Sequence, residues 1–174
     1  MGLFGDIARA AANAAVDAAK DKATEAVSSS LGRIATPKRE VTFCGNSERQ
    51  IYTYYGKPLK QVRQGDCFIA DVVTKPIKLT SELTGGVWDT AAEGVALAYK
   101  GKVFGATSVL GTTFKNLVRR GYKVKVGCTM VGWYAPGIPE ILMTIPDPNE
   151  IFAWLDDCEH SGEEVSFDVW KARR

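Results

Sequence analysis

The segment Gly94–Ile145 constrains the fold more than any other part of the chain, because its turns and regular elements follow one another in a clear order. Two short apolar runs flank Lys100-Gly101, which is the pattern of a β-hairpin. Thr112 is expected as the N-cap of a following helix, and Gly121 as the residue after its last turn. The expected elements are strands at 95–99 and 103–105, a helix at 112–121, and a long strand pair at 123–134 and 140–145. This order predicts a small β-rich module.

Further short β-type runs, bounded by Gly, Pro and Asn, lie on both sides of this segment. They are expected at 41–44, 50–55, 67–74 and 165–170, with a second short helix at 149–158. Short strands with two short helices predict the α+β class, in the form of a small barrel-like sheet domain over residues 41–170. A chain of 174 residues has room for one such domain and an appendage.

Residues 1–32 are expected to form an alanine-rich amphipathic helix, joined to the domain by a polar linker over 33–40. Alanine has the highest helix propensity, and polar residues recur here at helical spacing. Helices that lie on membranes usually have a polar face rich in Lys and Arg, whereas this polar face is nearly neutral and the apolar face is mostly alanine. We therefore expect residues 3–27 to dock on a partner protein or to form a homo-oligomer. A loosely attached helix and membrane contact are the less favoured alternatives.

The cysteines and the single histidine restrict the chemistry of the chain. The four cysteines are scattered without a C-x-x-C pair, a distribution typical of reduced thiols in a cytosolic protein. Structural zinc needs clustered Cys and His ligands, and His160 is the only histidine, so no metal site is expected. The sequence also has no apolar run of the roughly 18 residues that a membrane span needs, and no secretory signal pattern. We therefore expect a cytoplasmic protein.

No motif in the sequence predicts a reaction. His160 follows Cys158 by two positions, but side chains at this spacing do not have to face each other, and a nucleophile needs an activating base. The stretch 105–111 precedes a helix but lacks the Gly-Lys-Ser/Thr that a P-loop requires. The acids at 156–164 do not have the spacing of an EF-hand. We expect a non-enzymatic binding module without catalytic residues, cofactor or metal.

The net charge of +2 conceals a segregation of charge along the chain. Residues 100–125 contain seven Lys or Arg and no acid, whereas residues 126–170 contain nine acids and no Lys or Arg. Asymmetry of this kind carries information about binding partners. Two interpretations stay open: the acidic segment folds back and pairs with the basic one, or the basic surface is free for a ligand.

A free basic surface would bind the phosphates of nucleic acid, and aromatic side chains among the bases would add stacking platforms for single strands. Three tyrosines, Tyr52, Tyr54 and Tyr55, lie among such bases, between Arg49 and Arg63, and Tyr54 and Tyr55 are the two expected to stack. The cations of residues 100–125, which we call the basic strip, are Lys100, Lys102, Lys115, Arg119, Arg120, Lys123 and Lys125. We expect the strip to bind single-stranded DNA or DNA ends. The rival hypothesis is a protein-interaction or structural module that associates through the N-terminal helix and has no nucleic-acid ligand.

The order of several motifs resembles the HIRAN family. Tyr54-Tyr55-Gly56 comes first, Asp89 then lies ahead of the strand-like run 95–99, and a Gly-Lys-Val-Phe-Gly return and a helix leading into paired strands follow. The family's basic–acidic pair, with Asn and Asp just before the strand, is replaced here by 84–93, with extra residues after Asp89. HIRAN domains are small β-barrel modules associated with recognising DNA ends and single strands. The resemblance covers about residues 41–145 and implies Tyr54, Tyr55 and Asp89 as DNA-binding positions.

Overall fold

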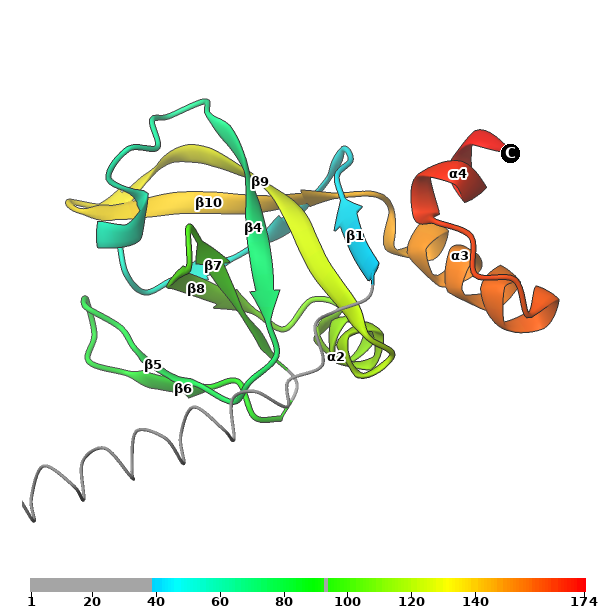
Figure 1. The fold of residues 1–174 in the computed structure, drawn as a ribbon. Coiled ribbons are helices and arrows are strands. Elements are labelled where there is room, and N and C mark those ends of the chain that lie inside the picture. Colours follow the sequence, from blue (N-terminus) through cyan, green and yellow to red (C-terminus); the bar gives the residue numbers. More distant parts are fainter. Residues whose placement is uncertain (1–38, 93) are drawn as a thin grey trace, which may run out of the picture. The chain divides into compact units, whose positions relative to one another are not determined.

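Most strands of the domain belong to one sheet that curls into a nearly closed barrel. The computed structural model describes residues 39–92 and 94–174, which lie in one unit of the chain, Pro37–Arg174. The strand order is β2-β10-β9-β4-β7-β8-β3, with β1 parallel to β9 (Figure 1). The strands are β1 (Arg39–Phe43), β2 (Ser47–Gln50), β3 (Tyr52–Thr53), β4 (Cys67–Val73), β7 (Val95–Tyr99), β8 (Lys102–Thr107), β9 (Tyr122–Ala135) and β10 (Ile138–Ile145).

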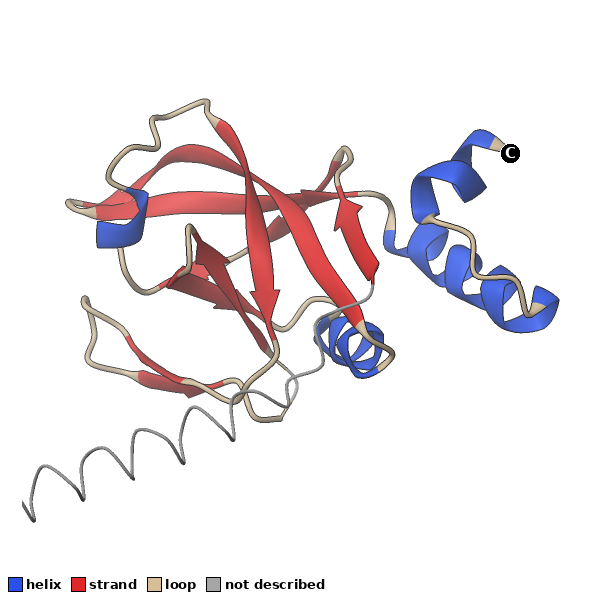
Figure 2. Ribbon diagram, viewed as in Figure 1, coloured by secondary structure: helices blue, strands red, loops and turns tan. Residues whose placement is uncertain are grey.

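The remaining described elements surround this sheet. Two strands form a separate hairpin. The α-helices lie at two places, α2 next to the start of β9 and α3 with α4 near β1, while a short 3-10 helix lies apart from both (Figure 2). These elements are β5 (Lys78–Thr80), β6 (Val87–Asp89), the 3-10 helix η1 (Lys57–Leu59), α2 (Gly111–Arg119), α3 (Pro148–Ser161) and α4 (Phe167–Ala172). The predicted α+β class with a barrel-like sheet is confirmed, although the described helices outnumber the two that the sequence predicted.

The barrel is held near closure by a single stretch of chain that changes partners. Gln50 at the end of β2 pairs with Leu142 of β10, whereas Tyr52 at the start of β3 pairs with Ala106 of β8. The Thr53 hydroxyl then donates a 2.7 Å hydrogen bond to the carbonyl oxygen of Pro139, which joins β3 to β10 through a side chain. Beyond Gln50 the chain therefore no longer pairs with β10, so that β3 and β10 separate. The space beside them becomes available for a binding site.

The hairpin of β7 and β8 has the turn that the sequence predicted. Tyr99 pairs with Lys102, and the two residues between them, Lys100 and Gly101, have φ values of 49° and 77°. A two-residue turn with positive φ at both positions matches the right-handed twist of the flanking strands, and Gly adopts it without steric cost. This turn fixes the register of a strand pair that is almost completely buried.

The helix α2 closes one end of the barrel with Phe114 and Leu117, which are both buried. The predicted N-cap, Thr112, is wrong, because the helix already begins at Gly111 and its N-cap Leu110 lies in the left-handed region with φ of 55°. The predicted C-terminal glycine is correct, since Gly121 has φ of 90° directly after the C-cap.

The predicted last strand at 165–170 is wrong, because α4 occupies this place. The apolar residues alternate along the chain, but the two that become buried are Phe167 and Trp170, whose spacing puts them on one side of a helix. The indole nitrogen of Trp170 donates a 2.7 Å hydrogen bond to a carboxylate oxygen of Asp157 on α3. Packing against α3 therefore decided between two periodicities that a short segment could satisfy.

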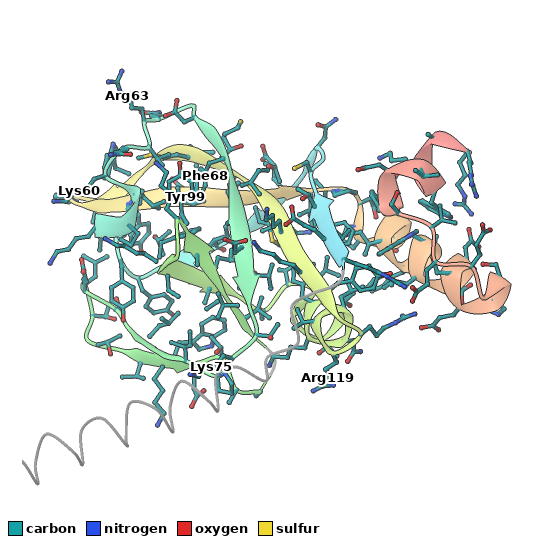
Figure 3. The ribbon with its side chains drawn as sticks, in the orientation of Figure 1. Lys60, Arg63, Phe68, Lys75, Tyr99 and Arg119 are labelled. Atoms are coloured by element: carbon teal, nitrogen blue, oxygen red, sulfur yellow. The ribbon has the colours of Figure 1, made fainter. Side chains whose placement is uncertain are left out.

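The core of the domain is rich in aromatic rings. Phe43 on β1 lies 5.9 Å from Trp154 and 5.3 Å from Phe167, measured between ring centroids, so that β1, α3 and α4 share one aromatic cluster. Inside the barrel, Phe68 and Tyr99 lie side by side with centroids 4.9 Å apart (Figure 3). Edge-to-face contacts of this kind add to the free energy gained from burying the rings.

Several predictions concern residues that the structure does not describe. The N-terminal helix over 1–32, its association surface at 3–27 and nearly all of the linker at 33–40 lie outside the described residues. Among the residues that are described, no helix is long and apolar enough to cross a membrane. In the same part of the chain, no group of three His, Cys, Asp or Glu side chains is close enough to hold a metal ion.

Candidate functional site

The main concave feature of the described surface is a cleft of about 760 Å³ between the β5–β6 hairpin and the barrel. Its walls come from three places: the hairpin, β3, and the paired strands β9 and β10. We call it the aromatic cleft, and its lining residues are Gln50, Ile51, Tyr52, Thr53, Tyr54, Ser81, Leu83, Thr84, Gly86, Val87, Trp88, Tyr134, Ile138, Glu140, Ile141 and Leu142. The cleft therefore occupies the region where β3 separates from β10.

Three aromatic rings form one wall of the aromatic cleft. The rings of Tyr54 and Trp88 are parallel to within 4°, with centroids 6.3 Å apart, and the Tyr52 ring lies 6.2 Å from Trp88 at 58°. Tyr134 also lines the cleft and is 75 % exposed, and Tyr52 is 53 % exposed. Flat rings that are exposed in a cleft suit a planar ligand that can stack on them.

The local sequence explains how these rings come to one face. Tyr52 and Tyr54 are two positions apart on an extended segment, so their side chains point to the same side of it. Trp88 belongs to the facing hairpin, and it packs over Gly94, where a Cβ atom would lie only 2.6 Å from the ring carbon Cη2 of Trp88. A side chain at position 94 would therefore displace the indole and deform this wall.

A second, smaller pocket of about 460 Å³ adjoins the aromatic cleft and shares three of its rings, those of Tyr52, Tyr54 and Trp88. We call it the Asp89 pocket, because Asp89 is the only acid among those of its lining residues that the structure describes. One carboxylate oxygen of Asp89 accepts a 2.9 Å hydrogen bond from the backbone N–H of Ala91, which closes an Asx turn. The position of the carboxylate is thus held by its own loop.

The loop that carries Asp89 is fastened by a lysine of the basic strip. Lys115 Nζ donates hydrogen bonds to the carbonyl oxygens of Thr90, Ala91 and Ala92, at 3.0, 3.2 and 2.8 Å. All three donors of the ammonium group are thereby used. Lys115 is consequently a support for the wall of the Asp89 pocket and has no donor left for a phosphate in this arrangement.

Three other cations of the basic strip form ion pairs. Arg120 pairs with Glu159 of α3 at 3.1 Å, so that the acidic C-terminal segment does contact one residue of the strip. Lys125 lies 2.7 Å from Glu40, and Lys123 lies 3.5 Å from Asp71. Because two of these acids come from β1 and β4, the partial neutralisation of the strip depends on strand pairing as well as on the acidic segment.

The remaining cations of the strip contact uncharged groups of the described surface. Lys100 donates a 3.1 Å hydrogen bond to the side chain of Gln61 and lies 5.2 Å above the Tyr99 ring. Arg119 donates to Asn116 on its own helix at 3.1 Å and extends away from the strands (Figure 3). Lys102 is exposed at the start of β8. These residues keep their charge available to a ligand.

The strand register places Lys102 near the tyrosine wall. Lys102 precedes Phe104 by two positions on β8, and the carbonyl oxygen of Phe104 accepts from the backbone N–H groups of Tyr54 and Tyr55, at 2.9 and 3.1 Å. On the hairpin, Lys78 is the register partner of Asp89. Lys78 therefore lies beside Asp89 on the hairpin, and Lys102 lies two positions along β8 from the residue that holds the tyrosine segment, although neither lysine lines a pocket.

The predicted site residues fall into two groups in the structure. Tyr54 and Asp89 line the Asp89 pocket together, while the hydroxyl of Tyr55 accepts a 3.3 Å hydrogen bond from the backbone N–H of Thr80 on β5. The seven cations of the strip do not line either pocket. The sequence prediction thus included part of the aromatic wall. It grouped the seven cations on one surface, whereas most of them contact other groups of the domain.

The predicted site residues leave out most of the residues that line the two pockets, and four of those left out carry an aromatic ring or a charge, namely Tyr52, Trp88, Tyr134 and Glu140. A signal existed for two of them. Tyr52 precedes Tyr54 by two positions and so shares its face of an extended segment, and Trp88 directly precedes Asp89. No local pattern connects Tyr134 and Glu140 to these residues, because only the closure of the barrel brings β9 and β10 beside β3.

The ionisation of the site follows from its surroundings. Burial raises the pKa of the Tyr54 hydroxyl above its ordinary value, and the neighbouring Tyr52 adds to the shift. Tyr54 therefore stays a neutral phenol at physiological pH, which suits a stacking surface. In the strip, the hydrogen bond between Lys125 and Glu40 raises the pKa of the lysine and lowers that of the carboxylate.

Cys158 and His160, the candidates for nucleophilic chemistry, do not line either pocket. Cys158 is buried in α3, and the nearby His160 is an exposed residue whose Nδ1 lies 2.9 Å from the carbonyl oxygen of Asp156. Burial raises the pKa of the Cys128 thiol far above its ordinary value, so this group stays protonated. Neither cysteine lines the aromatic cleft or the Asp89 pocket.

With the geometry described, the chain can be compared with known proteins. No model of a known protein family matches the sequence, no curated protein matches it, and no solved structure matches the fold.

Proposed function

We propose that the protein is a non-enzymatic binding module that takes the end of a single-stranded nucleic acid into the Asp89 pocket and the aromatic cleft. The observation that carries this proposal is the shared aromatic wall of Tyr52, Tyr54 and Trp88, which joins the two pockets. Every base has a flat face, and stacking of a base on an aromatic side chain contributes about 1–3 kcal/mol to binding.

The carboxylate of Asp89 favours an end over the interior of a strand. A carboxylate repels phosphate, and it accepts hydrogen bonds from hydroxyl and amino groups. A terminal sugar has a free hydroxyl group in the place where an internal sugar has a phosphate. A terminal nucleotide whose base stacks on Tyr54 or Trp88 can therefore direct its hydroxyl to Asp89, whereas an internal nucleotide would bring a negative charge there.

The available cations supply the electrostatic part of the binding. Lys78 is the register partner of Asp89, Lys102 begins β8, and Lys100 lies in the turn just before Lys102. Each phosphate that a lysine neutralises releases bound counterions, so the affinity falls as the salt concentration rises, with a slope of about −0.7 per contact for single strands. Two or three contacts of this kind predict a shallow but measurable salt dependence.

The experiment that tests the proposal is a titration of the full chain with a fluorescent oligothymidylate at two salt concentrations. Trp88→Ala is expected to weaken binding by about tenfold or more, because it removes a stacking surface. Trp133→Ala is the control: Trp133 is another tryptophan of the described surface, 58 % exposed where Trp88 is half-buried, and it lines neither pocket. Equal affinities of the two variants would overturn the proposed site.

A circular oligothymidylate of the same length separates ends from internal single strands, because it presents the same bases without a terminal hydroxyl. It is expected to bind more weakly than the linear form. If the wild-type chain binds no oligonucleotide at low salt, where electrostatic attraction is strongest, the proposal fails. Removal of residues 1–31 would then test the rival function, association through the N-terminal segment.

A further inference from the structure

Glu140 is the acidic side chain of the aromatic cleft, and no cation balances it there. It lines the cleft from β10, together with Tyr134 and Ile138. Its register partner on β9 is Gly132, so the residue directly opposite has no side chain to cover the carboxylate; a Cβ atom at Gly132 would lie 3.8 Å from Glu140 Oε2. Within residues 39–92 and 94–174, Glu140 forms none of the ion pairs.

A carboxylate in this position accepts hydrogen bonds and repels phosphate. The lining residues of the aromatic cleft include no Lys or Arg, so the part of a nucleic acid that enters the cleft is the base. Tyr52, Tyr134 and Glu140 all line the cleft, so the exposed tyrosine rings offer stacking surfaces in the same space as the carboxylate. A base stacked there turns its polar edge toward the carboxylate.

On the basis of the proposed function, we infer that Glu140 makes the aromatic cleft select guanine. The Watson–Crick edge of guanine carries N1–H and the N2 amino group side by side, and the two oxygens of one carboxylate can accept both hydrogen bonds together. Cytosine and adenine place an acceptor nitrogen beside their amino group. Thymine and uracil have one N–H between two carbonyl oxygens. Guanine is therefore the base that gives both carboxylate oxygens a donor without bringing an acceptor against them.

The charges around the pockets favour a base over the other natural partner of a carboxylate, a cationic peptide. Lys78 lies opposite Asp89 in the hairpin, and Lys102 precedes the part of β8 that pairs with the tyrosine wall. Lys57, on η1, is exposed as well. A peptide rich in Lys or Arg would meet these like charges, whereas the phosphates that flank a stacked base would meet opposite charges.

The test uses the full chain and three short oligothymidylates that differ only in one terminal base, which is thymine, guanine or hypoxanthine. Hypoxanthine keeps N1–H and lacks the N2 amino group. Guanine is expected to raise the affinity by about tenfold over thymine when placed at the end that the pocket accepts, and hypoxanthine to give an intermediate value. Both ends are tested in turn.

Two variants separate hydrogen bonding from net charge. Glu140→Gln is expected to abolish the preference for guanine, because an amide offers one acceptor and one donor instead of two acceptors. Glu82→Gln removes the same charge from the exposed turn of the hairpin, where the residue does not line the cleft, and it is expected to leave the preference unchanged. Retention of oligothymidylate binding by Glu140→Gln shows that the variant is folded.

The outcomes that overturn the inference are distinct from those that overturn the proposed function. Equal binding of the three oligonucleotides, or a guanine preference that survives Glu140→Gln, overturns the role of Glu140 while the stacking site stands. Absence of binding to all three at low salt overturns both. Binding of a hexalysine probe that Glu140→Gln abolishes also overturns the inference, because the occupant of the cleft is then a cationic peptide.

Discussion

The domain has two groups of aromatic side chains, which differ in how far they are buried and in whether the charged and polar groups beside them are paired. The first joins β1, α3 and α4 through Phe43, Trp154 and Phe167, with Trp154 only 1 % exposed. The second lines the aromatic cleft, where Tyr52 and Tyr134 are more than half exposed. Burial of large apolar rings is the main stabilising contribution to a small domain, whereas exposed rings gathered in a cleft contribute little to stability and remain available to a ligand.

The two groups also differ in how their polar atoms are treated. In the buried group, the indole nitrogen of Trp154 donates a 2.8 Å hydrogen bond to the carbonyl oxygen of Val165, as a buried donor should. In the cleft, the carboxylates of Asp89 and Glu140 form no ion pair with another described residue. The difference teaches that the buried cluster satisfies its polar atom within the fold, whereas the cleft and the adjoining pocket keep carboxylates without a counter-charge among the described residues, which a ligand can use.

The largest effect on stability is expected from the buried group. Trp154→Ala should lower the free energy of unfolding by about 3–5 kcal/mol, because it leaves a cavity among Phe43, Tyr122 and Phe167. Urea unfolding followed by circular dichroism measures the change. A loss below about 1 kcal/mol would mean that the helices α3 and α4 are not an integral part of the core.

A substitution in the wall of the aromatic cleft should have the opposite result, with a large loss of binding and a smaller loss of stability. Trp88→Ala is expected to reduce the affinity for a single-stranded oligonucleotide by about tenfold or more, while the free energy of unfolding falls less than in Trp154→Ala. Both quantities are measured on the same preparation, by fluorescence anisotropy and urea unfolding. If Trp88→Ala unfolds the domain as readily as Trp154→Ala does, the distinction between the two groups is wrong.

Lys115 refines the comparison, because this cation holds the loop of the Asp89 pocket in place without lining either pocket. Lys115→Met breaks three hydrogen bonds to the loop 90–92 and should lower the free energy of unfolding by about 1–3 kcal/mol. It should also weaken oligonucleotide binding without changing the salt dependence. Lys102→Ala is the contrasting variant, since it should reduce the slope of affinity against salt by about 0.7 and leave stability unchanged. A reduced slope in Lys115→Met would identify Lys115 as a phosphate ligand.

The smallest effect concerns the ion pairs that partly neutralise the strip. The hydrogen bond from Lys125 lowers the pKa of Glu40 below its ordinary value of 4.5. Because the pKa is lower in the folded state, this contribution to stability is present above the ordinary value and is lost as the pH falls through the lowered one. Glu40→Gln should therefore flatten the acid side of the stability profile, measured by urea unfolding across the acidic range. Glu48→Gln, at an exposed position on β2, is the control and should keep the wild-type profile.

Much of the fold could be predicted from the sequence, because the signals are local. The turn at Lys100-Gly101, the strand pair that became β9 and β10, and the helix ending before Gly121 all depend on residues close to one another in the chain. The hairpin β5–β6 was not predicted, since its strands are three residues each. The helix α4 was mistaken for a strand because a short apolar segment satisfied two periodicities at once.

The candidate site could be predicted only in part, and the reason lies in long-range pairing. Tyr54 and Asp89 were found from the sequence, yet their neighbour Glu140 comes from the other end of the domain. The seven cations of the strip formed one group by position in the sequence. Strand register and helix packing then gave Lys115 to a loop, Lys125 to Glu40 and Arg120 to Glu159.

By itself, the sequence determined the turns, most of the strands and the segregation of charge, since backbone preferences and side-chain periodicity act over a few residues. Only the tertiary structure decided which aromatic rings are buried and which remain exposed. It also decided which charges are paired, because a partner such as Glu40 for Lys125 lies far away in the chain. Burial and ion pairing depend on the surface that distant segments present to one another, and the aromatic cleft is the place where such segments meet without filling the space between them.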